Sequence, residues 1–327
     1  MDSSSLFNTQ ILNEYEQEVN ESKQEPQHNL LDLPNNKNKE KESNISKNEN
    51  CIFGFNIIRN EDINKEVLII GFPQKKDINL IEVIINTKNI KSANKLKFYR
   101  EKSNNLKYIL DKSITNLRKL FFECSTLTSL DLSKFDSKNI ANMSHMFDGC
   151  SRLTTLNLCN LNTEKVTDMS FMFNDCNFIK YLELSSFNTN NVKDMSNMFS
   201  ECHSLINLNL SNFNTNNVIN MNDMFRCCYS LTKLDLSNFK TQNVINMSYM
   251  FYSCKELTKL DLSNFITNNL INMNYIFFGC FSLNLLNLKN FDINKVISMK
   301  GIFDNTNVFF SLISNDKKIL NEFNIRS

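Results

Sequence analysis

Seven cysteines recur in this 327-residue chain at a constant interval of 26 residues. Thiolates bind zinc and can be oxidised to disulfides, so these cysteines are the first candidates for chemistry. A zinc site needs four ligands brought together by close spacing, which a 26-residue interval does not provide. The seven are Cys124, Cys150, Cys176, Cys202, Cys228, Cys254 and Cys280.

Disulfides between these positions are also not expected. Equivalent positions on packed helices lie about 8–10 Å apart, whereas a disulfide needs Cα atoms within about 7 Å. We therefore interpret each of the seven as a small core residue, and we predict no metal and no cofactor. Cys159 and Cys227 fall on offsets that should face solvent, which makes them the candidate reactive thiols.

Paired carboxylates are the other possible source of chemistry. Asp235 and Asp261 occupy equivalent positions and could serve glycoside hydrolysis. Lys233 and Lys259 stand two residues before them, which favours a charge-compensated ladder instead. Three histidines without a patterned nucleophile and only five glycines support no other catalytic arrangement. We predict no catalytic residues; a carbohydrate-acting enzyme is the last alternative.

The 26-residue period itself indicates a solenoid, in which each repeat packs only on its neighbours. In one repeat, Met195, Met198, Phe199 and Cys202 follow the i, i+3, i+4, i+7 pattern of one helical face. Asp194, just before them, can accept hydrogen bonds from the first free amides of a helix. The pattern predicts a helix of about two turns in every repeat, with the methionines filling the core.

The other half of each repeat alternates with period two. Leu208-Asn209-Leu210 is one example, with both leucines predicted to point inward from a short strand. A helix between successive strands makes them parallel neighbours through a right-handed connection. The fold class expected is therefore α/β, a right-handed solenoid of a parallel sheet plus short helices.

Two motifs give this repeat a family resemblance. The strand half reads Leu231-x-x-Leu234-x-Leu236, and the other half reads Met221-x-x-Met224-Phe225-x-x-Cys228. Repeated over about residues 114–305, this module resembles the BspA-like leucine-rich-repeat surface proteins. The resemblance implies a right-handed leucine-rich-repeat solenoid and a protein-interaction or adhesive role, and it brings no catalytic residues.

Composition divides the chain into four parts. Residues 1–50 form a polar, acidic segment expected to be disordered, because it cannot bury enough apolar surface. Residues 51–113 contain short β-branched runs at 67–72 and 80–85 and are predicted to be an N-terminal α/β cap. Residues 114–305 carry about seven repeats, and residues 306–327 are predicted to close the array as a C-terminal cap.

Outward positions of the repeats are the candidate binding surfaces. One set projects from the strands, on the concave face through which leucine-rich-repeat proteins commonly bind: Tyr181, Glu183, Lys233, Asp235, Lys259 and Asp261. The second set is a cluster of aromatic residues on the outer helical face: Tyr249, Tyr252, Tyr275 and Phe278. Clustered exposed aromatics are typical of interaction surfaces, unless the C-terminal segment folds over them.

Charge and hydropathy narrow the class of partner. A net charge of +1 gives no electrostatic basis for binding nucleic acid, and no stretch reaches the about 18–20 apolar residues of a membrane span. The sequence shows no secretory signal, so we expect a cytoplasmic location. We predict a non-enzymatic scaffold that binds a protein. A cell-surface adhesin exported without a classical signal peptide is the alternative.

Overall fold

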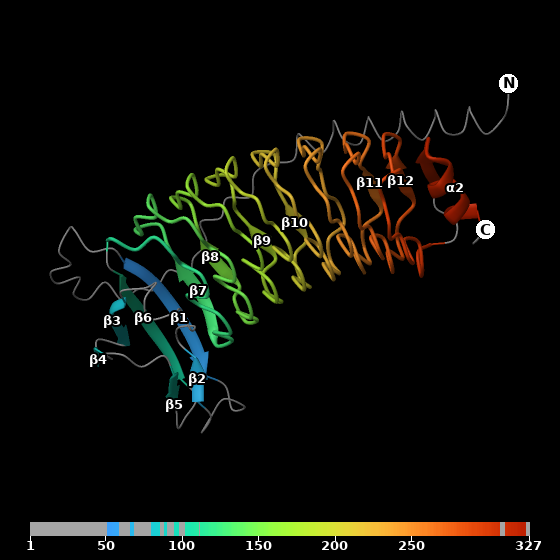
Figure 1. The fold of residues 1–327 in the computed structure, drawn as a ribbon. Coiled ribbons are helices and arrows are strands. Elements are labelled where there is room, and N and C mark those ends of the chain that lie inside the picture. The colour runs from blue at the N-terminus through green and yellow to red at the C-terminus, as the bar shows by residue number, and fades with distance from the viewer. Residues whose placement is uncertain are drawn as a thin grey trace. The chain divides into compact units, whose positions relative to one another are not determined.

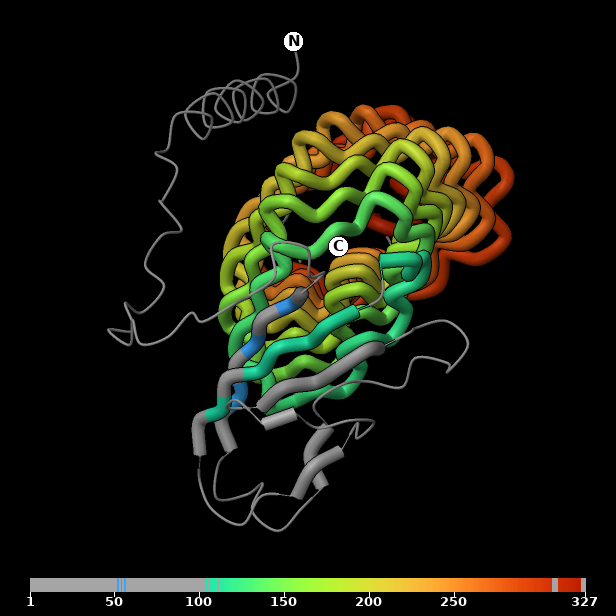
Figure 2. The backbone as a smooth tube through the Cα atoms, turned by 90° about the vertical axis from the view of Figure 1, so that its left-hand side faces the viewer, coloured from blue at the N-terminus to red at the C-terminus, as the bar shows by residue number. Residues whose placement is uncertain are grey.

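The computed structural model describes residues 51–58, 66–68, 80–85, 88–89, 95–97, 102–110, 112–307 and 311–324. The segment predicted to be disordered, residues 1–50, lies outside this part of the chain. From residue 114 onward the chain winds into a parallel β-solenoid of about seven coils, each coil made by one 26-residue repeat (Figure 1). Figure 2 shows these coils one behind another. The predicted solenoid is confirmed.

Strands line one side of the coils and pair in parallel with a register of one repeat. Leu130 lies opposite Leu156, for example, and Leu260 opposite Leu286. Residues 233–236 form no assigned strand, yet Leu234 and Leu236 are buried as in the other coils. The strands are β7 (Leu127–Asp131), β8 (Thr155–Asn157), β9 (Tyr181–Leu182), β10 (Asn207–Leu208), β11 (Lys259–Asp261) and β12 (Leu285–Leu288).

The prediction of a short helix in each repeat is wrong. Where the sequence predicts a helix, the backbone makes successive tight turns with i→i−3 hydrogen bonds, such as Met198 N to Met195 O at 3.3 Å. Asn197 and Glu201 have φ of 56° and 59°. A right-handed helix cannot continue through left-handed residues. Inward side chains at i, i+3, i+4 and i+7 are therefore compatible with two alternating turns as well as with a helix.

Amides that a helix would use internally instead join neighbouring coils. Alternate N–H groups from Met195 to Glu201 donate to the carbonyls of the next coil, as in Asn197 N to Asn222 O at 2.9 Å. The predicted N-cap, Asp194, accepts from the amide of Ser196 at 2.8 Å, which starts a turn rather than a helix. Parallel bridges at this position run from Asn116 to Ser298 and connect all the coils.

A stack of phenylalanine rings forms the centre of the core. Neighbouring rings lie 5.6–6.1 Å apart with interplanar angles of 6–10°. The predicted burial of the methionines and of the seven cysteines around this stack is confirmed, with Met299 partly buried at the end. The stacked residues are Phe121, Phe147, Phe173, Phe199, Phe225, Phe251, Phe277 and Phe303.

Polar side chains also form ladders inside the array. The hydroxyl of the fully buried Thr215 donates to the carbonyl of Lys240 at 2.9 Å and accepts from the amide of Lys240 at 2.7 Å. The side-chain amide of Asn212 donates to the carbonyls of Leu184 and Phe187 in the preceding coil, at 3.0 and 2.8 Å. Equivalent threonines are Thr163, Thr189, Thr241 and Thr267, and equivalent asparagines are Asn238 and Asn264.

Thr215→Val should lower the free energy of unfolding by about 2–3 kcal/mol, because two backbone groups of Lys240 lose their buried partner while volume is preserved. Urea unfolding at neutral pH measures this change. Thr215→Ser is the matched control, because a serine already occupies the equivalent position of an earlier coil. There the hydroxyl of Ser137 accepts a hydrogen bond from the amide of Asn162 at 2.7 Å. A loss for serine with little loss for valine would show that the threonine column contributes through its methyl groups instead.

The described part of residues 51–113 is an antiparallel β-module, where the sequence predicts an α/β cap. Its main sheet has the order β4-β3-β6-β1 and continues through β1 into β7, the first strand of the array, in antiparallel pairing. Tyr108 packs edge-on against Phe121, with ring centroids 5.1 Å apart, and so covers the first coil. The strands are β1 (Cys51–Ile58), β2 (Glu66–Leu68), β3 (Leu80–Ile85), β4 (Lys88–Asn89), β5 (Lys95–Lys97) and β6 (Lys102–Leu110).

The last coil is covered by a strand and a helix. Strand β13 (Ser311–Ser314) pairs in parallel with β12, and α2 (Lys317–Asn324) follows it. Asp316 caps α2 by accepting from the amide of Lys318 at 2.8 Å. Ile319 is fully buried, and the Phe323 ring meets the last ring of the core stack, Phe303, edge-on at 5.9 Å.

Candidate protein-interaction surface

Four aromatic rings form a two-by-two array on the side of the solenoid made by the tight turns. Tyr249 stacks on Tyr275 with centroids 5.2 Å apart, and Tyr252 stacks on Phe278 at 4.8 Å with an interplanar angle of 3°. Within each coil the two rings lie 5.7 and 5.8 Å apart. All four side chains are partly exposed. We call Tyr249, Tyr252, Tyr275 and Phe278 the aromatic array.

Two members of the aromatic array adopt a backbone conformation that does not suit tyrosine. Tyr249 and Tyr275 have φ of 58° and 54°. The left-handed region favours Gly, Asn and Asp, and a bulky residue there costs about 1–2 kcal/mol. The equivalent residue two coils before Tyr249 is Asn197, which fits this conformation. The coil therefore does not require tyrosine at this position. Backbone strain that the fold does not require is typical of functional sites.

A glycine follows these two tyrosines in the same column of the next coil. Gly301, one coil after Tyr275, also has positive φ, at 64°. A Cβ placed there would lie 2.5 Å from Cε1 of Tyr275, so the absence of a side chain makes room for the ring. The Nζ of Lys300 lies 5.9 Å from the Tyr275 ring centroid. The aromatic array thus ends at Gly301, which leaves space for the Tyr275 ring.

Cations border the aromatic array on the preceding coil. The Arg226 guanidinium lies 5.4 Å from the Tyr252 centroid, and the Nζ of Lys255 lies 3.9 Å from the Tyr229 centroid. Tyr229 in turn stacks on His203 at 4.5 Å. Cations over ring faces add about 0.5–1 kcal/mol each at exposed sites. These contacts help to orient Tyr252 of the aromatic array and the neighbouring Tyr229.

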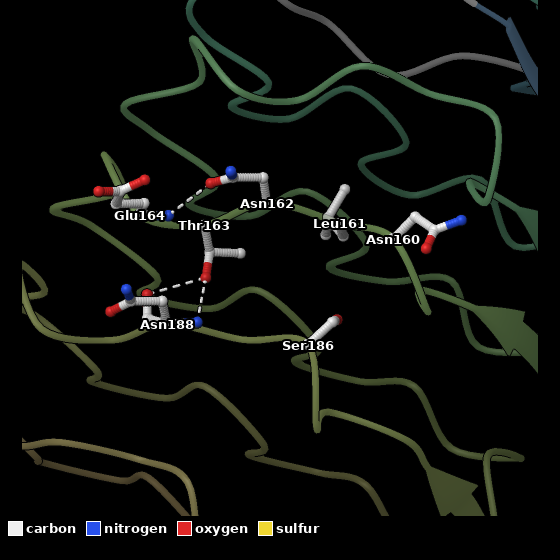
Figure 3. A pocket seen from close by; sticks show the side chains of 7 residues that line it. All are labelled: Asn160, Leu161, Asn162, Thr163, Glu164, Ser186 and Asn188. Atoms are coloured by element: carbon white, nitrogen blue, oxygen red, sulfur yellow. Dashed lines mark hydrogen bonds between the residues drawn. The ribbon is translucent and has the colours of Figure 1, made fainter.

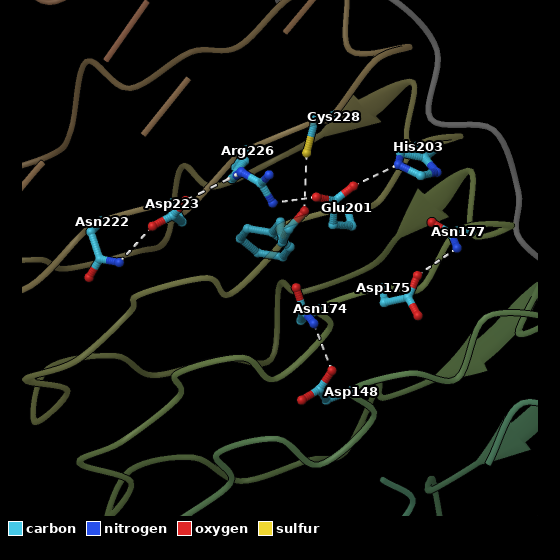
Figure 4. Close-up of polar contacts among 11 residues, drawn as sticks. Asp148, Asn174, Asp175, Asn177, Glu201, His203, Asn222, Asp223, Arg226 and Cys228 are labelled. Atoms are coloured by element: carbon cyan, nitrogen blue, oxygen red, sulfur yellow. Dashed lines mark hydrogen bonds and ion pairs between the residues drawn. The ribbon is translucent and has the colours of Figure 1, made fainter. Parts of the chain in front are cut away.

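A polar network continues along the same side toward the N-terminus (Figure 4). Arg226 forms ion pairs with Glu201 and, at 3.6 Å, with Asp223; Glu201 also meets His203 at 2.8 Å. Burial raises the pKa of the Asp223 carboxyl, although a hydrogen bond from Asn222 and the charge of Arg226 act in the opposite direction. These charged groups pair with one another and form a polar border next to the aromatic array.

The strand-side candidates are spread along the array. Tyr181 is 57% exposed and is the sole aromatic residue among them. The carboxylates of Glu183, Asp235 and Asp261 each accept from the backbone amide two residues later, at 2.8–2.9 Å. They hold the turn that follows each strand. Lys233 is exposed, and Lys259 is partly buried.

One predicted solvent-facing thiol is buried. Cys159 is exposed as predicted, but Cys227 is only 4% exposed and interacts with the Tyr229 hydroxyl. Cys227 occupies an outward position of the repeat, but the side chain of Tyr229 covers its thiol. The nine cysteines between residues 124 and 280 are all free. The seven in the 26-residue series lie in the core, and six of these donate to phenylalanine carbonyls of the preceding coil, as Cys228 Sγ does to Phe199 O at 3.1 Å.

No other described feature offers a stronger site. A shallow pocket of about 270 Å³ between coils is lined by Asn160, Leu161, Asn162, Thr163, Glu164, Ser186 and Asn188 (Figure 3). Thr163 there is already engaged by Asn188. No cluster of His, Cys, Asp or Glu in the described ranges could hold a metal ion, and no helix in them is long and apolar enough to cross a bilayer.

Comparison with known families fits the repeat architecture. A family model described as Mycoplasma protein of unknown function, DUF285, matches residues 86–204, 115–234, 176–285 and 229–322, which is most of the chain. The chain belongs to the DUF285 family. Comparisons with curated proteins and with solved structures give no match. Each matched stretch spans several coils of the β-solenoid, and successive stretches overlap along it.

The threonine ladder of this DUF285 chain has a signal in the sequence that matches the spacing of the cysteines. Thr163, Thr189, Thr215, Thr241 and Thr267 recur every 26 residues, like the cysteines. Polar residues at loop-like positions are ordinarily expected to face water, which concealed their role. In the structure they are buried and connect coils, so the abundant asparagine and threonine are part of the scaffold.

Proposed function

We propose that this DUF285 chain is a non-enzymatic scaffold that binds a protein partner through the aromatic array. The observation that carries the proposal is the presence of Tyr249 and Tyr275 at left-handed backbone positions, with their rings partly exposed. Tyrosine supplies large contact area with few rotatable bonds and is enriched among residues that dominate binding energy. The resemblance to BspA-like leucine-rich-repeat proteins is consistent with this role and with right-handed winding of the coils.

The strand side is the weaker candidate surface. Its outward residues are mostly short and polar, Tyr181 has no aromatic neighbour among them, and three carboxylates are already used to hold turns. Binding hot spots are clustered and surrounded by contacts that exclude water. The aromatic array meets this description, because its four rings are contiguous and bordered by paired charges.

The test is a quadruple variant in which the aromatic array is replaced by the residues found at the same positions of an earlier coil. Tyr249→Asn, Tyr252→Ser, Tyr275→Asn and Phe278→Ser reproduce the Asn197 and Ser200 pair. Relief of left-handed strain offsets lost ring contacts of about 0.5–1.5 kcal/mol each, so stability should change little. Quantitative affinity purification from native cells should lose the partner. Tyr181→Ser, the strand-side control, should retain it; the opposite pattern would refute the proposal.

We further propose that the chain acts in the cytoplasm, because the nine cysteines between residues 124 and 280 are all free and one of them, Cys159, is exposed. Free thiols are typical of reducing compartments. Protease treatment of intact cells distinguishes this location from the adhesin alternative. The cytoplasmic proposal expects an intact chain, and cleavage would support display at the cell surface.

A further inference from the structure

Four isoleucines at one position of successive coils are exposed to solvent. Ile219, Ile245 and Ile271 are each 42% exposed, and Ile297 is 84% exposed. They recur every 26 residues and lie two positions before the first inward methionine of their coils. Isoleucine is among the residues most often fully buried in proteins, so a repeated exposed set differs from scattered surface residues. We call these four residues the isoleucine ladder.

Backbone hydrogen bonds hold the isoleucines directly above one another. The amides of Ile245, Ile271 and Ile297 each donate to the carbonyl of the preceding isoleucine at 2.9 Å. Hydrogen-bonded neighbours in β-structure are about 4.8 Å apart, so the ladder extends over about 14 Å. The result is a continuous apolar stripe with a fixed spacing, supported by the rigid core beneath it.

The fold does not require isoleucine at these positions. The same column in the preceding coils contains Thr115, Ala141, Thr167 and Lys193. Lys193 makes the same backbone contact, since its carbonyl accepts from Ile219 N at 2.9 Å. Small, polar and charged residues are therefore all compatible with the coil. The isoleucines begin at the coil of Ile219 and continue through the coils that carry the aromatic array.

The surface on both sides of the ladder is uncharged over the central coils. Asn217, Asn243 and Asn269 flank it on one side, each with its amide donating to a backbone carbonyl at 2.7–2.9 Å. Asn220, Asn246 and Asn272 flank it on the other side. In the earlier coils the flanking positions include Glu164, Lys165, Asp168 and Asp194. The central coils of two copies can therefore pack ladder to ladder without repulsion between like charges.

We propose that the isoleucine ladder is a self-association surface that binds a second copy of this chain. We place the two-fold axis perpendicular to the ladders, so that they run antiparallel and Ile245 of one copy faces Ile271 of the other. Both ladders have the same spacing, and identical β-branched side chains can interdigitate along their whole length. The flanking asparagines provide the polar rim typical of such an interface.

Sedimentation velocity of the full chain over a concentration series tests the proposal. The wild type should form a dimer, and Ile245→Lys with Ile271→Lys should abolish it, because lysine would face lysine across the axis. Lys193 already occupies this column, so circular dichroism and the melting temperature should remain close to wild type. Thr167→Lys, which adds charge in the same column outside the ladder, should leave the dimer intact.

A charge-swap variant tests the antiparallel register. In Ile245→Lys with Ile271→Glu, each lysine faces a glutamate of the other copy, so dimerisation should persist better than in the double-lysine variant. Equal loss in both variants would overturn the antiparallel arrangement. A monomeric wild type, or a double-lysine variant that still dimerises, would overturn the self-association surface itself. These outcomes are independent of whether the aromatic array binds a partner.

Discussion

The free energy of unfolding should fall by about 10 kcal/mol between neutral pH and about pH 10, because seven fully buried thiols cannot ionise in the folded state. Burial is the largest cause of the raised pKa of each of these thiols, and it raises the pKa of Cys202 and of Cys280 to about 12. Six of the thiols also donate hydrogen bonds to carbonyls, as Cys202 does to Phe173 O at 3.1 Å.

The sign follows from comparing the folded and unfolded chains. Below the ordinary thiol pKa of 9.0 both states keep the proton, so stability is complete. Above it the unfolded chain ionises while the folded chain remains protonated, and each thiol then costs about 1.4 kcal/mol per pH unit. The loss continues until the pH reaches the raised pKa values of the folded state.

Urea unfolding in the presence of a reductant, repeated from neutral pH to about pH 10, measures this loss. Cys228→Ser with Cys254→Ser is the matched variant, because serine can donate to the same carbonyls but does not titrate in this range. Its stability should fall less steeply with pH than that of the wild type. A pH dependence identical in both proteins would contradict the assignment, as would alkylation of the buried cysteines in the native protein as fast as that of Cys159.

Phe225→Ala should cost about 3–5 kcal/mol, the second largest effect expected. Phe225 is fully buried in the middle of the ring stack, with the rings of Phe199 and Phe251 each 5.7 Å away. Alanine would leave a cavity and remove two ring contacts at once. Because each coil is stabilised by its neighbours, the coils on both sides should become less protected.

Urea unfolding with hydrogen exchange of the variant measures both consequences. Phe225→Leu keeps most of the volume and should cost much less than alanine. Phe281→Ala is the control, since Phe281 is 54% exposed on the same side of the array. A loss below about 1 kcal/mol for Phe225→Ala would mean that the core rearranges around the missing ring.

The core could be predicted from the sequence because its signal is periodic and chemically uniform. The 26-residue spacing of Cys202 and its equivalents identified the solenoid, and the alternation at Leu208 and Leu210 identified the strand half. Burial of the methionines followed from the same register. The assignment of Tyr249 and its neighbours to an outward position needed only this register.

The conformation of the other half could not be predicted from that pattern. Met195, Met198, Phe199 and Cys202 point inward in a helix and equally in two alternating turns. What distinguishes them is left-handed backbone at Asn197 and Glu201, and the same two columns also contain phenylalanine, tyrosine and cysteine, which conceal the requirement. Hydrogen bonds between coils decide the outcome, and these depend on neighbours 26 residues away rather than on local propensity.

The outward columns were only partly recognised. The exposed isoleucine ladder has no local pattern that separates it from core residues, because Ile219 directly follows the buried Val218. The amides of asparagines such as Asn212 connect coils, a role that their polar character alone does not predict. In both cases the missing information is which side of the coil a residue faces, and that is a property of the turn geometry.

Hydroxyl-radical footprinting of the chain with and without its captured partner tests whether the aromatic array is the binding surface. We expect oxidation of Tyr249, Tyr252, Tyr275 and Phe278 to fall on binding, while oxidation of the strand-side Tyr181 stays unchanged. Protection of Tyr181 together with an unprotected aromatic array would contradict it, and would place the binding surface on the strands.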